Sequence, residues 1–403
     1  MQQNENDKNP IEVDKNDETE PEVDIDNIPD SAEIADFDEE DRRAPNGGLI
    51  YANDEEVKEQ RKLGWDFLKS LPYNLLHGHA ISSVSLPAKF FEPRSYLERM
   101  TEFWSSAPLL TKASELSNPV DRMQYVVAFM IAGLHKEVVP QQKPFNPILG
   151  ETWQGTFPDG TVIYCEQSSH HPPVSNFELI APSNAWHLYG KQDLAASMRG
   201  NSIKVTHAGR HYVEFKDGQL ITYEMPQLLL RGILFGQRVA EVLGAVKFLD
   251  AQNRLGCKLE FNPNTKGVMG RFVGWLSGNK LPPVDAVRAE IFTYPENCSD
   301  PWDDSTTKTP VTIGEGTWLS FLEFNGKRVW DIKEQIKYKA IATDSPLPSD
   351  SRYRDDLQAL QQEDYDGAQR WKVALEERQR EEARLRKGGI QGLAHKREEE
   401  SVQ

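Results

Sequence analysis

Short strand-like runs follow one another closely through the middle of the chain. Pairs of residues suited to hairpin turns lie between several of them, Asp-Gly at 159–160 and 217–218 and Asn-Gly at 325–326. Closely spaced strands joined in this way favour an antiparallel barrel or sandwich. The candidate strands are residues 161–165, 202–206, 211–215, 219–223, 244–249, 256–261, 269–275, 287–293, 318–324 and 328–331.

Helical patterns flank the strands, so the predicted fold class is mainly β with flanking helices (α+β). Residues 119–135 carry apolar side chains on a helical period, and residues 357–386 predict a charged helix. A third segment, residues 63–76, suits a short amphipathic helix broken near Pro72. On the sequence alone, a helix packed permanently on the core is the favoured interpretation of this segment. Its apolar positions are Leu63, Trp65, Phe67, Leu68, Leu71, Leu75 and Leu76.

Composition narrows the possible functions. The 403-residue chain has a formal net charge of -17, which argues against nucleic-acid binding. We expect no transmembrane helix, because the chain lacks an apolar run of about 18 residues, and its N-terminus lacks the regions of a signal peptide. Three widely spaced cysteines without a C-x-x-C motif favour a reducing compartment. We therefore expect a cytoplasmic protein.

The acidic residues are unevenly distributed along the chain. Residues 1–47 are rich in Asp and Glu and poor in aromatic residues, so we expect a disordered acidic tail. A solubilising role for this tail is favoured over a brake on binding to anionic membranes. Residues 388–403 are also polar and are expected to fray. Residues 48–387 remain as one domain, because a barrel can form a large single domain.

The sequence offers little enzyme chemistry. It has no G-x-S-x-G, H-E-x-x-H or Walker motif. Asp303 and Asp304 are adjacent carboxylates without a third ligand nearby, which makes a poor site for a hard cation. We therefore expect no catalytic residues, no metal site and no cofactor.

The octapeptide 166–173 (Glu-Gln-Ser-Ser-His-His-Pro-Pro) ends a strand-like run. Pro172 and Pro173 cannot donate ladder hydrogen bonds, so pairing should stop or turn to an edge there. In an extended chain His170 and His171 point to opposite faces, which makes a shared metal ion difficult. Each can donate hydrogen bonds and become partly cationic near neutral pH. On these residues alone a satisfied polar pair, an anion site and a metal site all remain open.

Two other segments place charge on an irregular or a helical backbone. Residues 143–153 (Lys-Pro-Phe-Asn-Pro-Ile-Leu-Gly-Glu-Thr-Trp) set Lys143 among prolines, where a solvated lysine is the ordinary explanation. Lys372, Glu376 and Arg380 follow at i, i+4 and i+8, so they share one face of a predicted helix. On a solvated surface they would make two ordinary ion pairs worth about 0.3–0.5 kcal/mol each.

The three segments, in this order, resemble the fingerprint of the oxysterol-binding protein family, whose octapeptide reads E-Q-V-S-H-H-P-P. The resemblance covers roughly residues 60–387, and residues 90–93 (Phe-Phe-Glu-Pro) match the family's stretch after its lid. Ser168 stands where the family has valine, which puts strand packing in doubt more than headgroup contact. The resemblance implies a site for the phosphorylated headgroup of a lipid, made of Lys143, Asn146, His170, His171, Lys372, Glu376 and Arg380.

The resemblance also implies the architecture of a lipid carrier. We expect a large, incomplete antiparallel β-barrel that encloses a lipid tunnel, with an N-terminal lid at about residues 63–76 and C-terminal helices. Trp104 resembles an aromatic residue near the tunnel wall, although a core tryptophan fits the sequence equally well. The chain leaves no room for the pleckstrin-homology module of long members, so we expect a short, monomeric shuttle that contacts membranes transiently.

The function implied by the resemblance is lipid binding and transfer between membranes. The first ligand would be phosphatidylinositol 4-phosphate, and the second a sterol or another lipid such as phosphatidylserine. No covalent reaction is implied. The alternative is a lipid-dependent sensor or regulator, which would bind the same lipids but act through a protein partner.

Overall fold

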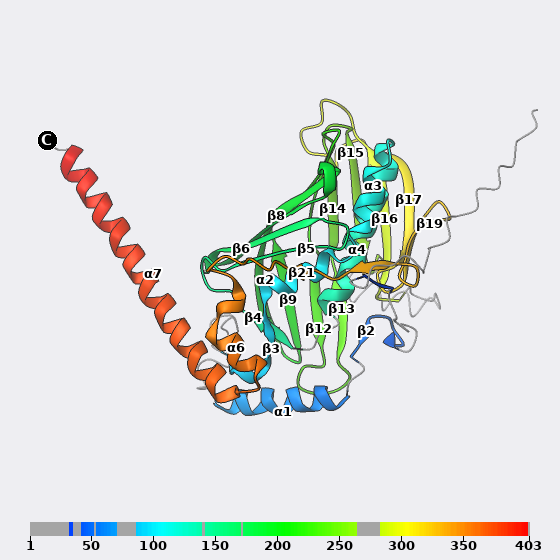
Figure 1. Ribbon diagram of the computed structural model, residues 1–403. Helices are drawn as coiled ribbons and strands as arrows, with labels where there is room; N and C mark the ends of the chain where they lie inside the picture. Colours follow the sequence, from blue (N-terminus) through cyan, green and yellow to red (C-terminus); the bar gives the residue numbers. More distant parts are fainter. Residues whose placement is uncertain are drawn as a thin grey trace, which may run out of the picture.

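The computed structural model describes residues 32–34, 42–51, 54–70, 86–138, 142–170, 172–263 and 283–401 (Figure 1). A strongly curved, 17-stranded sheet dominates these residues. Its ladders are antiparallel throughout. The predicted mainly β fold class is therefore confirmed.

The main run of the sheet passes from β21 at one end to β19 at the other. In the part of the chain that the structure describes these two strands do not pair, so the sheet is an incomplete barrel, as predicted. Its strands in spatial order are β21 (Ile341–Ala342), β5 (Thr152–Thr156), β6 (Val162–His170), β7 (Pro173–Ile180), β8 (Trp186–Arg199), β10 (Arg210–Phe215), β11 (Leu220–Glu224), β14 (Ala245–Asp250), β15 (Leu255–Phe261), β16 (Ala286–Thr293), β17 (Thr309–Thr317), β18 (Phe321–Phe324) and β19 (Lys327–Asp331).

The sheet divides at the long strand β8. The first part of β8 pairs with β10, and its last part pairs with β9 (Ser202–Ala208). From β9 the second branch continues through β12 (Gln227–Arg231) and β13 (Val239–Leu243) to β2 (Leu49–Ile50). Gly209 joins β9 to β10 with a φ of 120°, and a Cβ atom there would lie 2.2 Å from the Lys191 carbonyl oxygen. Glycine is therefore required where the chain crosses between the branches.

Helix α4 (Pro119–Val138) forms the centre of the core. Met123, Val127, Ile131 and Leu134 are all fully buried, which confirms the helical period predicted over residues 119–135. The helix contacts β15 and β19, so its apolar side chains join the inner face of the sheet in one cluster. It is preceded by α2 (Tyr96–Met100), the 3-10 turn η6 (Thr101–Trp104) and α3 (Pro108–Ser114).

Smaller elements gather at the lower end of the sheet in Figure 1. There η5 (Ala88–Phe90) contacts both α1 (Asp54–Ser70) and α7 (Tyr365–Ser401), and α6 (Asp355–Gln361) packs on α7. Nearby β3 (Phe91–Ser95) pairs in parallel with β4 (Lys143–Phe145). The remaining elements are β1 (Ala32–Ile34), which pairs with β20 (Ile336–Tyr338), and the turns η7 (Pro182–Asn184) and η8 (Ser351–Tyr353).

Several element boundaries differ from those predicted. Helix α1 begins at Asp54, well before residue 63, because the acidic residues at 54–56 suit the first turn of a helix. The predicted C-terminal helix is divided into α6 and α7 at Glu363, which adopts a φ of 61°. Strand β17 was not predicted, and the predicted strand at 318–324 is confined to Phe321–Phe324.

Other predictions meet the limits of the described residues. The predicted strand at 269–275 lies outside them. Strand β1 and the end of α7 lie within segments 1–47 and 388–403, for which the sequence predicts disorder. No helix in the described residues is both long and apolar enough to cross a membrane.

Candidate functional site

Two stacked aromatic rings form the base of the candidate site. Phe91 on β3 and Phe145 on β4 lie with their ring centroids 4.6 Å apart and their planes at 23°. The parallel pairing of the two strands holds the rings in place. The sequence reasoning did not single out either ring, although both fall within segments used for the family resemblance.

Three cations lie over these rings and together form what we call the cation cluster. The ammonium nitrogens of Lys143 and Lys372 lie 5.0 and 5.6 Å from the Phe91 centroid. The Arg354 guanidinium lies 5.5 Å from the Phe145 centroid. The structure thus brings together the predicted residues Lys143 and Lys372, which are far apart in the sequence.

The predicted Asn146 completes the Lys143 side of the cluster. Lys143 Nζ donates hydrogen bonds to Asn146 Oδ1 and, at 3.3 Å, to the Pro144 carbonyl oxygen. The Asn146 carbonyl oxygen in turn accepts a hydrogen bond of 2.8 Å from Arg354 Nη1. The acceptors of Lys143 are therefore neutral oxygens, whereas its charged neighbours are cations.

This charge arrangement lowers the pKa of Lys143 to about 8. The largest cause is burial of the ammonium, followed by the positive charges of Lys372 and Arg354. Lys143 as a whole is an exposed residue, so the burial concerns its ammonium end, which lies against the Phe91 ring and the Asn146 amide. A bound anion would favour the charged lysine and oppose this shift.

The predicted helical trio lies on α7. Lys372 is buried, with 6% of its surface exposed, and its ammonium forms an ion pair with Glu376. Arg380 lies 4.0 Å from the other oxygen of Glu376, and its side chain is 56% exposed. The i, i+4, i+8 spacing therefore produces the expected pairs, but the first lysine is buried in the cluster and not on a solvated surface.

Arg354 and Glu151 are the residues that sequence reasoning missed. Arg354 Nη1 donates to Glu151 Oε2 at 2.8 Å, and Arg354 also forms two hydrogen bonds to Asp356. Glu151 accepts further hydrogen bonds from the Ile148 amide and from Ser95. Burial raises the pKa of Glu151, and the Arg354 charge opposes this. Glu151 lies within the segment 143–153, and a carboxylate among prolines and apolar residues was the available signal for a buried cationic partner.

The histidine segment lies beside the Lys143 segment. Main-chain hydrogen bonds of 2.8 and 2.9 Å join Gly150 and Glu151 to Gln167 of β6. His170, at the end of β6, lies opposite Pro173 and is half-buried. His171 lies outside the described residues, so its predicted role stays a prediction.

Ser168 does not disturb strand packing. Its side chain is exposed, and Asn176 Nδ2 donates a hydrogen bond of 2.6 Å to its hydroxyl. A polar residue therefore suits this position, and the doubt that the substitution raised about strand packing does not apply.

The predicted lid and tunnel residues are only partly described. Trp65 lies on α1 and is 44% exposed. Trp104 is buried in the core, with its ring 4.7 Å from that of Phe177 on β7. Phe67 and Leu68 belong to α1, but their side chains are not described. The remaining predicted positions, Leu71, Leu75 and Leu76, lie outside the described residues.

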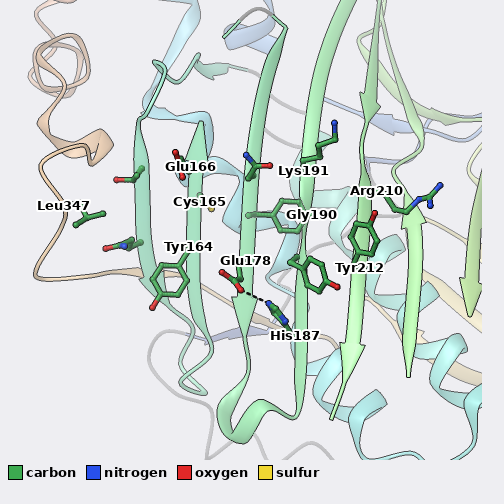
Figure 2. Close-up of a pocket in the computed structure, with 15 residues that line it drawn as sticks. Tyr164, Cys165, Glu166, Glu178, His187, Gly190, Lys191, Arg210, Tyr212 and Leu347 are labelled. Atoms are coloured by element: carbon green, nitrogen blue, oxygen red, sulfur yellow. Dashed lines mark hydrogen bonds and ion pairs between the residues drawn. The ribbon is translucent and has the colours of Figure 1, made fainter. Parts of the chain in front are cut away.

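A cavity of about 680 Å³, which we call the outer groove, lies elsewhere on the outer face of β5, β6, β7, β8 and β10 (Figure 2). The rings of Tyr189 and Tyr212 stack there with centroids 5.1 Å apart. His187 and Glu178 face each other across the groove at 2.9 Å. None of the predicted headgroup residues lines it, so the largest hollow and the cation cluster are separate sites.

Comparison with known proteins agrees with the fold and with the sequence motifs. The chain is 36% identical over 345 residues to oxysterol-binding protein 9 of Dictyostelium discoideum, covering 84% of this chain and 79% of that protein. It is 29% identical to human oxysterol-binding protein-related protein 5 over 83% of this chain, but it spans only 37% of that protein's length.

Solved structures share the fold. The Osh3 ORD of Saccharomyces cerevisiae, solved in complex with PI(4)P, superposes with a TM-score of 0.60 at 24% identity, covering 81% of this chain and 84% of the other. The Osh1 ORD domain in complex with ergosterol gives the same TM-score and identity, covering 81% and 80% of the two chains. The sequence profile of the oxysterol-binding protein family matches residues 65–278 and 323–398. The chain therefore belongs to the oxysterol-binding protein family.

Proposed function

We propose that this protein binds phosphatidylinositol 4-phosphate and exchanges it for a second lipid between membranes. The observation that carries the proposal is the convergence of Lys143 and Lys372 on the Phe91 ring. The two lysines come from distant parts of the chain, and their shared position gives a compact site of positive charge. A yeast relative of the same fold was solved with PI(4)P, which supports this choice of ligand.

A phosphate monoester fits the charge of the cation cluster. It carries about -1.5 to -2 charges near neutral pH and offers three strong acceptor oxygens. Lysine meets phosphate as a point charge, and arginine can form a paired contact. Lys143 and Lys372 would bind the phosphate, while Arg380, exposed on the next turns of α7, would reach it from the rim.

The other predicted residues have complementary roles in this proposal. Glu376 holds the Lys372 ammonium and has a second oxygen facing Arg380, so it can also accept hydrogen bonds from inositol hydroxyls. Asn146 positions Lys143. His170 and His171 would donate hydrogen bonds to phosphate oxygens from the end of β6.

The acyl chains would lie inside the curved sheet, with α1 as the lid. Hiding each methylene from water contributes about 0.8 kcal/mol, so an enclosed apolar interior stabilises a lipid in transit. A lid must be weakly attached so that it can open. The second lipid is a sterol or another lipid such as phosphatidylserine; solved relatives were crystallised with ergosterol and cholesterol. No covalent chemistry is involved, and the protein would work in the cytosol with transient membrane contact.

Extraction of phosphatidylinositol 4-phosphate from liposomes tests the proposal. A Lys143→Ala/Lys372→Ala variant should lose at least about 100-fold in affinity, because each lysine makes a charge-assisted contact. Lys191→Ala/Lys327→Ala removes the same charge elsewhere and should extract as the wild type does. If the folded double variant at the cluster extracts normally, the headgroup site is wrong.

A lipid-dependent regulator is the rival function. It would bind the same lipids with similar affinity but release them slowly, because its action depends on a protein partner. Transfer between donor and acceptor liposomes, followed by fluorescence, separates the two functions. Tight binding with negligible transfer would exclude the shuttle.

A further inference from the structure

The loop between β12 and β13 presents a bare phenylalanine. Phe235 is 64% exposed, although the loop around it is firmly held. Asn201 Oδ1 accepts hydrogen bonds from the Leu234 and Phe235 amides at 2.7 and 3.2 Å, and Asn201 Nδ2 donates to the Phe235 carbonyl oxygen at 2.8 Å. Gly232 adopts a φ of 71°, and a Cβ there would lie 2.0 Å from the Gln237 carbonyl oxygen. An ordered loop that exposes a large apolar ring indicates a surface that meets a partner.

The same loop is joined to helix α1. Arg61 of α1 donates hydrogen bonds to the carbonyl oxygens of Gly232, at 2.9 Å, and of Gly236. Arg238, just after the loop, donates to Gln60 Oε1 at 2.6 Å. Figure 1 shows α1 running beneath the ends of β12 and β13. The loop that carries Phe235 therefore also holds the helix that we propose as the lid.

The outward side of α1 continues this surface. Lys58, Lys62, Trp65 and Lys69 are all exposed and occur at i, i+4, i+7 and i+11, so they lie along one face of the helix. Lys58 and Lys69 pair with Glu55 and Asp66, but all four side chains are more than half exposed, and such pairs hold their lysines weakly. A tryptophan between lysines is the composition of a helix at a membrane surface.

We propose that Phe235 together with Lys58, Lys62, Trp65 and Lys69 forms a docking face for an anionic lipid bilayer, and that the Phe235 loop is the latch of α1. This inference rests on the proposed lipid transfer and names the surface that would meet the membrane. Seating Phe235 among the lipids shifts the loop and weakens the contacts of Arg61 with Gly232 and Gly236. Docking and lid opening are thereby coupled through one side chain.

Charge complementarity favours a bilayer as the partner. The whole chain carries a formal net charge of -17, so an anionic membrane repels most of its surface. A local row of lysines beside exposed aromatic rings gives attraction at one place and so orients the protein. The rings enter the interface, while the long lysine side chains keep their ammonium groups at the headgroups.

Vesicle flotation tests the docking face. Wild type should bind phosphatidylcholine vesicles that contain phosphatidylserine better than pure phosphatidylcholine vesicles, and Phe235→Ser should lower the partition coefficient by about tenfold. Leu347→Ser removes an equally large apolar side chain that is 45% exposed on another surface, and should bind as the wild type does. Equal binding by Phe235→Ser and wild type overturns the docking face, and so does an absence of wild-type binding to either vesicle.

Arg61→Ala tests the latch. It should leave vesicle binding unchanged but raise the rate of lipid extraction, because the helix opens without docking; an unchanged rate overturns the latch. Binding of a short-chain, water-soluble phosphatidylinositol 4-phosphate separates this inference from the proposed function. Phe235→Ser should bind this probe normally. If wild type does not bind it, the headgroup proposal fails while the vesicle result still decides the docking face.

Discussion

The cation cluster and the outer groove hold charge in opposite ways. In the groove each charged side chain lies near one of opposite sign: Lys191 lies 3.3 Å from Asp193, Arg210 lies 3.7 Å from Glu224 and His187 lies 2.9 Å from Glu178. In the cluster Lys143 donates to neutral oxygens and is surrounded by the cations Lys372 and Arg354. The groove is balanced by its own residues, whereas the cluster is not.

This difference matters more for function than the size of a hollow. The groove has a volume of about 680 Å³ and is lined by stacked tyrosines, but its charges already satisfy one another. The cluster has excess positive charge, which lowers the pKa of Lys143 and which a bound anion would relieve. We therefore assign anion binding to the cluster, and variants of the two regions test that assignment.

The largest expected effect comes from Arg354→Ala. This change leaves the buried carboxylates of Glu151 and Asp356 without their cation, and breaking such a pair costs about 3–5 kcal/mol of folding stability. Chemical denaturation measures the loss. Arg210→Ala, which removes an exposed arginine at the groove, should change stability by less than about 0.5 kcal/mol. Similar losses in the two variants would contradict the structural role given to Arg354.

The next effect concerns ligand affinity. Lys143→Ala should weaken binding of phosphatidylinositol 4-phosphate about 10- to 100-fold, because one charge-assisted contact is lost. Lys191→Ala in the groove should leave affinity within about twofold. Titration with a short-chain ligand measures both, and an equal loss in the two variants would refute the assignment of anion binding to the cluster.

The fold and the positions of the charged residues were predicted to different extents. The helical period over residues 119–135 and the hairpin turns identified local elements, because burial and turn chemistry act over a few residues. Strand β17 was missed because its burial pattern is mostly exposed at the start, and Thr309, Pro310 and Val311 do not resemble a half-buried strand.

The parts of the site that needed tertiary contacts were not predictable from the residues alone. The spacing of Lys372 and Glu376 fixed their pairing, but only the structure shows that Lys372 is buried over Phe91. The family resemblance supplied the headgroup residues, and the structure connects Lys143 with Lys372. Arg354 was missed because its partner Glu151 is about two hundred residues away in the sequence.

The pH dependence of binding follows from Lys143. Its pKa of about 8 means that the free protein loses this charge as the pH rises through 8, while the bound anion favours the charged form. Affinity should therefore be flat between about pH 7 and 8, since the phosphate is largely dianionic above about pH 6. It should then fall by nearly tenfold for each pH unit above 8.

Arginine provides the control for this pH dependence. Lys143→Arg keeps a charge throughout this range, so its affinity should not fall above pH 8. Lys143→Ala should show a low affinity that is also independent of pH there. Binding isotherms at pH 7, 8 and 9 distinguish these cases, and a parallel fall in all three proteins would exclude Lys143 as the titrating group.

The smallest expected effect concerns the aromatic rings of the two regions. Phe91→Leu keeps an apolar side chain but removes the ring face beneath Lys143 and Lys372, which should lower affinity by about three- to fivefold, or 0.5–1 kcal/mol. Tyr212→Leu removes a ring stacked on Tyr189 in the groove and should leave affinity unchanged. Because both variants lose one aromatic stack, their difference isolates the contribution of a ring that lies under cations. If both variants bind the ligand as the wild type does, the Phe91 ring supports the cluster only by packing, and the excess charge alone accounts for anion binding.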